Sequence, residues 1–142
     1  MVRTRTNEGW RITRVEVTTY DRRNRAVRNG HSRPTWDQVQ AAILSLNAGR
    51  RSEMVIEAAN GSLLVIGGGQ GRFHVQLTYP RGSEPCNRLL TDPSRKNDTE
   101  ELIVGGVTTP LPARLIVDQA KARSAVFDIL TSGVPVSIGM ET

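Results

Sequence analysis

Cysteine and long apolar runs are the features that this sequence most clearly lacks. Its one cysteine, Cys86, cannot form a disulfide within the chain, and it cannot supply the several thiolates that a CxxC metal site requires. No apolar stretch approaches about 18 residues, the length that spans a bilayer, and no apolar segment follows the first residues as in a signal peptide. We therefore expect a cytoplasmic protein in a reducing compartment, without contact to a membrane.

Side chains for catalysis are also scarce. Neither histidine, His31 or His74, is followed two positions later by the glutamate that zinc-dependent nucleobase deaminases need. The Pro-Cys pair of that motif occurs at Cys86, but Leu89 stands where its second cysteine belongs. A nucleophilic dyad of Cys86 with His74 remains only a weak alternative, because nothing in the sequence brings the two together.

The glycine-rich run at residues 67–71 resembles a phosphate-binding loop in composition only. A dinucleotide fingerprint needs a glycine at the sixth position, where Arg72 stands, and a P-loop needs Gly-Lys-Ser/Thr. A strand pattern follows the run, so no helix N-terminus faces a phosphate. We expect a tight hairpin turn here, and for the whole chain no cofactor, no metal, no small-molecule substrate and no enzymatic activity.

Positive charge is concentrated at the N-terminus. Residues 1–33 contain nine arginines and three acidic residues, a net charge of +6, so that residues 34–142 carry −1 of the total of +5. We divide the chain into a basic N-terminal strand and loop or arm (1–33) and a nearly neutral body (34–142), one domain overall. The arginines could bind nucleic acid through its phosphates, with Trp10 or Tyr20 stacking on bases. We favour instead a flexible solubilising arm or simply arginine-heavy codon usage, because the arginines do not share one strand face and only two aromatic residues are interleaved with them.

The basic segment contains one strand signal. Residues 11–20 mix β-branched and polar side chains in partial alternation, which predicts a strand near a sheet edge. Residues 21–33 are polar, with Asn29-Gly30 as a turn signal. Two interpretations of this stretch stay open, the return strand of a hairpin or a mobile loop.

The strongest local signals follow the basic segment. Thr35 is a good N-cap residue, Gln38 three residues later completes a capping box, and an apolar stripe with helical spacing continues until Gly49, which we expect to end the helix. Residues 53–79 then predict a three-stranded antiparallel meander, because Asn-Gly and the glycine run separate apolar and alternating stretches.

The rest of the chain gives shorter elements. In chain order we expect a long loop at 80–99 with a short strand at 87–91, a strand at 101–104, an extended segment at 109–112, a helix at 117–131 and a last strand at 135–138. Strands joined by hairpins favour the α+β class. We expect a single antiparallel β-sheet of about five to seven strands with two helices packed on one face, and His74 and Gln76 on the opposite, wetter face.

Five segments in a fixed order give the chain a family resemblance. They are Thr35-Trp36-Asp37, Leu64-Val65-Ile66-Gly67-Gly68-Gly69, Leu90-Thr91-Asp92-Pro93, Ile103-Val104-Gly105-Gly106, and residues 120–133 with Phe127. In this order the chain resembles the founding, first-numbered family of the Imm-series immunity proteins, which belong to bacterial polymorphic toxin systems and often pair with deaminase toxins. The chain departs from that family at its C-terminus, which has no tryptophan, and in its basic N-terminal segment.

The resemblance implies a protein that binds and neutralises a cognate toxin by covering its active site, as a heterodimer and without chemistry of its own. A nucleic-acid-directed toxin has a basic substrate cleft, so an acidic loop is our first candidate for the contact. An acidic toxin would instead meet arginines, and the alternative function is a small nucleic-acid-binding or regulatory domain, although we do not expect nucleic acid as the partner. The candidate contact residues are Asp92, Asp98, Glu100, Glu101, Arg22, Arg23 and Arg25.

Overall fold

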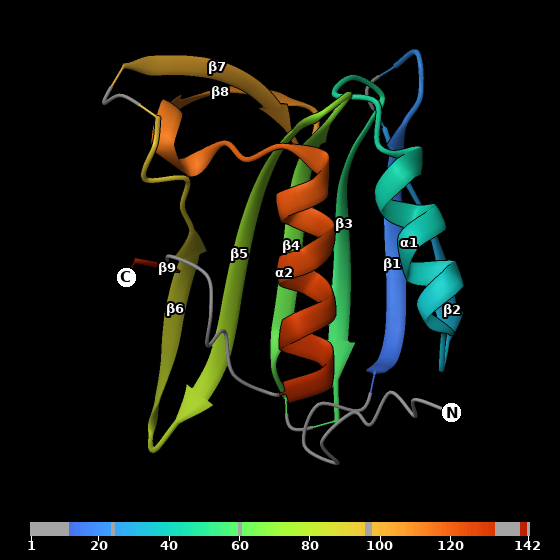
Figure 1. Ribbon diagram of the computed structural model, residues 1–142. Coiled ribbons are helices and arrows are strands. Elements are labelled where there is room, and N and C mark those ends of the chain that lie inside the picture. Colours follow the sequence, from blue (N-terminus) through green and yellow to red (C-terminus); the bar gives the residue numbers. More distant parts are fainter. Residues whose placement is uncertain (1–11, 24, 60, 96–97, 133–139, 142) are drawn as a thin grey trace.

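The computed structural model describes residues 12–23, 25–59, 61–95, 98–132 and 140–141, and Figure 1 shows how their elements are arranged. The strands are β1 (Ile12–Tyr20), β2 (Ala26–Ser32), β3 (Arg51–Ala58), β4 (Leu63–Gly69), β5 (Arg72–Arg81), β6 (Glu84–Leu90), β7 (Thr99–Val104), β8 (Val107–Pro112) and β9 (Met140–Glu141). The helical elements are α1 (Trp36–Ser45), the short 3-10 helix η2 (Ala113–Leu115) and α2 (Gln119–Ser132).

Most of the strands form one antiparallel sheet, in the order β2-β1-β3-β4-β5-β6-β9. β7 and β8 pair with each other as a separate antiparallel hairpin at one end of this sheet (Figure 1). Both helices lie on the same face of the large sheet (Figure 1), where α1 contacts β3 and β4, and α2 contacts β5. The predicted α+β class, with two helices on one face of an antiparallel sheet, is therefore confirmed.

The hydrophobic core fills the space between the helices and this face of the sheet. Along β5 the buried side chains Phe73, Val75 and Leu77 alternate with His74 and Gln76, which are half-buried on the opposite face, as predicted. The helices bury the following side chains against the sheet: Val39, Ile43, Ala122, Ala125, Val126, Ile129 and Leu130. The small side chains among them let α2 lie close to the strands.

The start of α1 has the predicted capping box. The Thr35 hydroxyl accepts a hydrogen bond from the Gln38 amide at 3.2 Å, and the Gln38 side-chain oxygen accepts one from the Thr35 amide at 2.9 Å. The next residue, Trp36, packs edge-on against the ring of Phe127 in α2, with ring centroids 5.2 Å apart. The C-terminal prediction was wrong: α1 ends at Ser45, before Gly49, because Leu46 is already extended.

The stretch at 21–33, for which two interpretations were open, is the return strand of a hairpin. β2 pairs with β1 along its whole length, and β1 pairs with β3, so the described part of the basic segment belongs to the large sheet. The carboxylate of Asp21 organises the connecting turn by accepting hydrogen bonds from the amides of Arg23 and Arg25, each at 2.9 Å. The sequence suggested a turn at Asn29-Gly30, and this prediction was wrong: both residues lie inside β2.

The expected loop at 80–99 was the largest error of the sequence analysis. β5 continues to Arg81 and turns directly into β6, and Pro80 lies opposite Pro85 in the ladder. The prolines are tolerated because no neighbouring strand lies where the missing amide of either one would point. The pairing of β5 with β4 ends at Thr78, before Pro80, and β9 pairs with β6 only at Leu89 and Leu90, beyond Pro85. The short strand expected at 87–91 is the second half of β6.

The other expected elements of this region are present, with one difference in how they pair. The strand expected at 101–104 is β7, and the extended segment at 109–112 belongs to β8. Gly105 and Gly106, which connect them, have φ values of 59° and 78°. These two strands do not join the large sheet. The strand expected at 135–138 lies outside the described residues. No helix in the described part of the chain is long and apolar enough to cross a membrane.

Candidate interaction surfaces

The acidic candidate residues surround the junction between β6, β7 and α2. Asp92 follows β6, where its Oδ1 accepts hydrogen bonds from the amide of Ser94 at 3.0 Å and from the Ser94 hydroxyl at 2.6 Å. The ammonium group of Lys121 in α2 lies 3.6 Å from the same carboxylate. The hydrogen bonds from Ser94 first, and then the charge of Lys121, lower the pKa of Asp92 from its ordinary value.

Glu100 is held by two arginines that the sequence analysis did not single out. Its carboxylate lies 2.8 Å from the guanidinium of Arg72 at the start of β5, and it also forms an ion pair with Arg95. Arg72 donates a further hydrogen bond to the carbonyl of Glu101 at 3.1 Å, and Arg95 donates one to the carbonyl of Ile116 at 3.1 Å. These contacts tie the β7-β8 hairpin to β5 and to the segment before α2.

Two of the four acidic candidate residues, Asp92 and Glu100, are therefore neutralised within the molecule. Arg72, Arg95 and Lys121 occupy the carboxylates of Glu100 and Asp92. The side chains of Asp98 and Glu101 are exposed and form no ion pair with a described residue. The structure thus brings Glu100 and Asp92 to basic partners of this chain and leaves the other two acidic candidates free.

The hydrogen bonds to Asp92 predict a pH dependence. A carboxylate whose pKa is lowered in the folded state contributes stability that is present above the unfolded pKa of about 3.9 and is lost as the pH falls through the folded pKa. We expect Ser94→Ala to raise the pKa of Asp92 and to reduce the loss of stability on acidification. An NMR titration of the Asp92 carboxyl, with Ser124→Ala on the exposed side of α2 as control, measures this. An unchanged Asp92 pKa in Ser94→Ala would contradict it.

The basic candidate residues lie at the turn between β1 and β2. Arg25 forms an ion pair with Asp21 at 2.9 Å, and the hydrogen bond from the amide of Arg25 is the main reason why the pKa of Asp21 is lowered. Arg22 and Arg23 are exposed and form no ion pair with a described residue. Residues 12–33 contain six arginines and two acidic residues, which gives this hairpin a net charge of +4.

β2 lies at an edge of the large sheet, and all of its residues are exposed. No described strand pairs with its outer side. The apolar side chain of Val27 is 49% exposed there. An edge strand of this kind offers a row of free backbone donors and acceptors, and proteins commonly protect such edges with charged side chains. In this chain the charges are Arg28 within β2 and the arginines at both of its ends.

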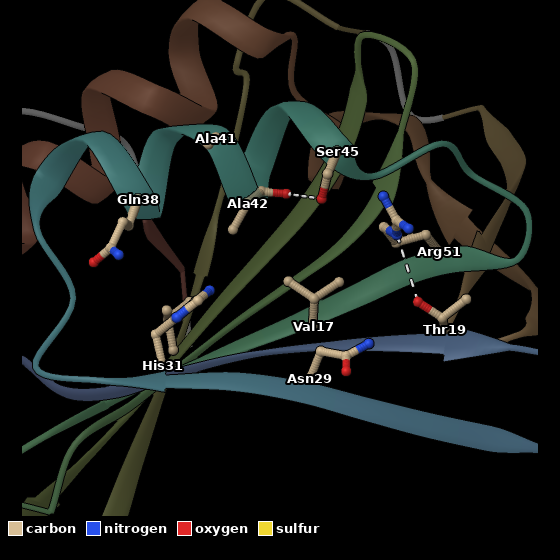
Figure 2. Close-up of a pocket in the computed structure, with 10 residues that line it drawn as sticks. Val17, Thr19, Asn29, His31, Gln38, Ala41, Ala42, Ser45 and Arg51 are labelled. Atoms are coloured by element: carbon tan, nitrogen blue, oxygen red, sulfur yellow. Dashed lines mark hydrogen bonds between the residues drawn. The ribbon is translucent and has the colours of Figure 1, made fainter.

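A groove of about 300 Å³ runs between α1 and the hairpin of β1 and β2 (Figure 2). Val15 and Val17 of β1 form its apolar floor together with Ala42 of α1. Its rim is polar, and it consists of Thr19, Asn29, His31, Gln38, Ser45 and Arg51, with Ala41 beside them. Figure 2 shows His31 of β2 and Gln38 of α1 on opposite sides of the groove. Arg51 lies at the other end of the groove from His31 and Gln38 and points toward Thr19. The Nε atom of Arg51 lies 3.5 Å from the Thr19 hydroxyl.

The groups that could have served catalysis or base stacking are separated. Cys86 pairs with Tyr79, which lies five residues along β5 from His74, a distance of roughly 16 Å. The Nδ1 atom of His74 lies 3.1 Å from the carbonyl oxygen of Leu115. The ring of Tyr20 covers Gly106, and Trp10 lies outside the described residues. Among the described residues no group of three or more His, Cys, Asp or Glu side chains could hold a metal ion.

Comparison with known proteins gives one structural likeness. No protein-family model matches the sequence, and no curated protein matches it either. The fold is similar to that of a hypothetical protein from Neisseria gonorrhoeae known from a crystal structure, with a TM-score of 0.64 at 11% sequence identity. The match covers 90% of this chain and 92% of that one. At this level of identity the similarity concerns the fold alone: the chain shares nearly the whole architecture of the hypothetical protein.

Proposed function

We propose that this chain is an immunity protein that binds and neutralises a cognate bacterial toxin by occluding its active site. The observation that carries the proposal is that segments of the resemblance, although far apart in sequence, contact one another. Trp36 of the first segment packs on Phe127 of the last. A side chain added at Gly67 would collide with Val104 at 2.4 Å, so the glycine run of β4 and the end of β7 are in direct contact.

These contacts give the order of the segments a physical meaning. Glycines are needed in β4 because the β7-β8 hairpin lies against it, and the Gly105-Gly106 turn is needed because the ring of Tyr20 lies over it. The segments thus act as a scaffold. The surfaces around a scaffold can vary with the partner, which fits a family in which each member binds its own toxin.

We place the contact with the toxin on the hairpin of β1 and β2. The acidic residues were our first candidate, but two of them are already paired with basic groups of this chain, and breaking those pairs would oppose binding. Arg22 and Arg23 carry free positive charge beside an exposed strand edge. This favours the second possibility of the sequence analysis, a toxin that presents an acidic surface.

The proposal is tested with the toxin domain that it predicts in the adjacent gene. Expression of that domain alone is expected to stop growth of the host, and co-expression of this chain is expected to restore it. The two proteins should purify together as a 1:1 complex with a nanomolar or lower Kd, the range of natural protein inhibitors. Equal survival with and without this chain would overturn the proposal.

The alternative, nucleic-acid binding through the arginines, needs a different test from simple truncation. β1 pairs with β2 and with β3 in the large sheet, so deletion of residues 1–33 would remove two strands of the sheet, β1 and β2. Arg22 and Arg23 are exposed and lie in the turn between β1 and β2, so the charge reversals Arg22→Glu and Arg23→Glu leave the strands intact. Salt-sensitive binding of duplex DNA, lost in this double variant, would support the alternative, and we expect no such binding.

A further inference from the structure

We propose that β2 receives an extended acidic segment of a partner protein as an additional strand of the large sheet. The inference rests on the proposed function in one respect, since it takes the toxin as the partner. It adds the mode of recognition: main-chain hydrogen bonds to a sheet edge supply affinity, and alternate side chains of the added strand supply specificity. Three features of the described residues support it, namely the backbone of β2, its charge and the groove beside it.

The backbone of β2 offers several free hydrogen-bonding groups in register. The amide of Arg33 bonds to the carbonyl of Thr13, and the amide of Asp21 to the carbonyl of Arg25. Because antiparallel pairs alternate between bonded and non-bonded positions, the odd-numbered residues of β2 direct their amides and carbonyls to β1. The even-numbered residues direct theirs outward, and these are Ala26, Arg28, Gly30 and Ser32. None of them is a proline, so every outward position carries a donor.

The charge of the hairpin selects an acidic occupant. With a net charge of +4 on residues 12–33, a segment rich in aspartate and glutamate gains attraction along the whole strand. A second copy of this chain fits poorly, because antiparallel pairing of two β2 strands about Asn29 would set Arg25 directly opposite Arg33 at both ends. Like charges at directly opposite positions destabilise a strand pair.

The groove under α1 gives the added strand a second contact. Asn29 and His31 of β2 point to the face that carries the helices and line the groove (Figure 2). Side chains of the added strand that point to this face would lie next to them, at the mouth of the groove. Val27 of β2, which is 49% exposed, lies on the same face as Asn29 and His31 and suits an apolar side chain there. The expected segment therefore alternates acidic residues with at least one apolar residue directed to the helix side.

A peptide experiment tests the edge without reference to any toxin. The probe is an end-blocked ten-residue peptide in which glutamate and valine alternate, added to the ¹⁵N-labelled protein. We expect the largest NMR shift changes at the amides of Ala26, Arg28, Gly30 and Ser32, and much smaller changes when lysine replaces glutamate in the peptide. Absence of binding, binding elsewhere, or equal binding of the lysine peptide would overturn the inference, as would a free protein that already dimerises through these amides.

A matched pair of variants separates the backbone from the charge. Ala26→Pro removes an outward amide without altering any charge or any hydrogen bond to β1, whereas Ala26→Val keeps the amide. We expect Ala26→Pro to weaken binding of the glutamate peptide, and of the adjacent toxin domain, by about three- to tenfold, the effect of one lost hydrogen bond, and Ala26→Val to bind as the wild type. Equal binding by both variants would contradict strand addition.

The toxin complex distinguishes failure of this inference from failure of the proposed function. In the complex, hydrogen exchange at the outward amides of β2 should slow by at least about tenfold. A complex that protects the host but leaves these amides unprotected would overturn the strand addition and leave the proposed function standing. Peptide binding at β2 without any toxin complex would do the reverse.

Discussion

Replacement of Gly69 by alanine is expected to destabilise the protein by roughly 3–5 kcal/mol, which is a large part of the stability of a domain of this size. Gly69 has a φ of +139°, a region that L-amino acids rarely adopt. A Cβ atom at this position would lie 2.5 Å from backbone atoms of Leu46 and Ala48, which cannot rotate away as a side chain could. Backbone strain and overpacking therefore act together at this residue.

Gly71→Ala is the matched control for this substitution. Gly71 lies two residues further along the same turn, with a φ of +80°, but a Cβ atom there would meet nothing within 4 Å. Gly71→Ala should lower the free energy of unfolding only by the cost of the left-handed conformation, about 1–2 kcal/mol. Urea unfolding of both variants measures the difference at a constant m-value. Equal losses in the two variants would show that the close approach of β4 to the segment after α1 does not matter for stability.

Phe73→Ala is expected to lower the free energy of unfolding by about 3–5 kcal/mol, the range for removing a buried phenylalanine from a core. The side chain of Phe73 is 1% exposed and lies in the core between β5 and the helices. Its backbone also forms a two-way bridge with Val117, with hydrogen bonds of 2.9 and 2.8 Å, just before α2. The cavity left by the substitution would lie where the sheet, the segment before α2 and α2 itself meet.

The second phenylalanine of the chain, Phe127, provides the control. Its side chain is 36% exposed and contacts the ring of Trp36, so Phe127→Ala should cost only about 1–2 kcal/mol. The two variants remove the same atoms and differ in burial. The midpoint of urea unfolding should fall well below that of the wild type for Phe73→Ala and only slightly for Phe127→Ala. A reversed order would contradict the position of the core described above.

Local signals predicted the elements whose formation depends on neighbouring residues alone. The capping box of Thr35 and Gln38 is satisfied by atoms three residues apart, so it forms wherever this segment is helical. The alternation along residues 73–79 requires only that one side of the strand meets a core. For this reason α1 and the meander of β3, β4 and β5 could be read from the sequence.

The candidate site could be predicted only in part. The sequence pointed to the acidic residues and to Arg22, Arg23 and Arg25, but it could not show that Glu100 meets Arg72 and Arg95. Arg72 lies 28 residues before Glu100, and the two meet because β7 and β8 pair with each other at the end of the sheet instead of joining it. The distribution of free and neutralised charge on the surface is therefore a property of the tertiary structure.

Capping, periodicity and turn chemistry act within a few residues, so the α+β class, the two helices and the central meander follow from the amino-acid sequence. That residues 26–32 form a strand, and that this strand lies at the edge of the sheet, follows only from the three-dimensional packing. The cost of a proline or the exposure of an amide depends on whether another strand lies beside it. Strand order is set by packing across the whole chain, and it is strand order that leaves β2 open to a partner.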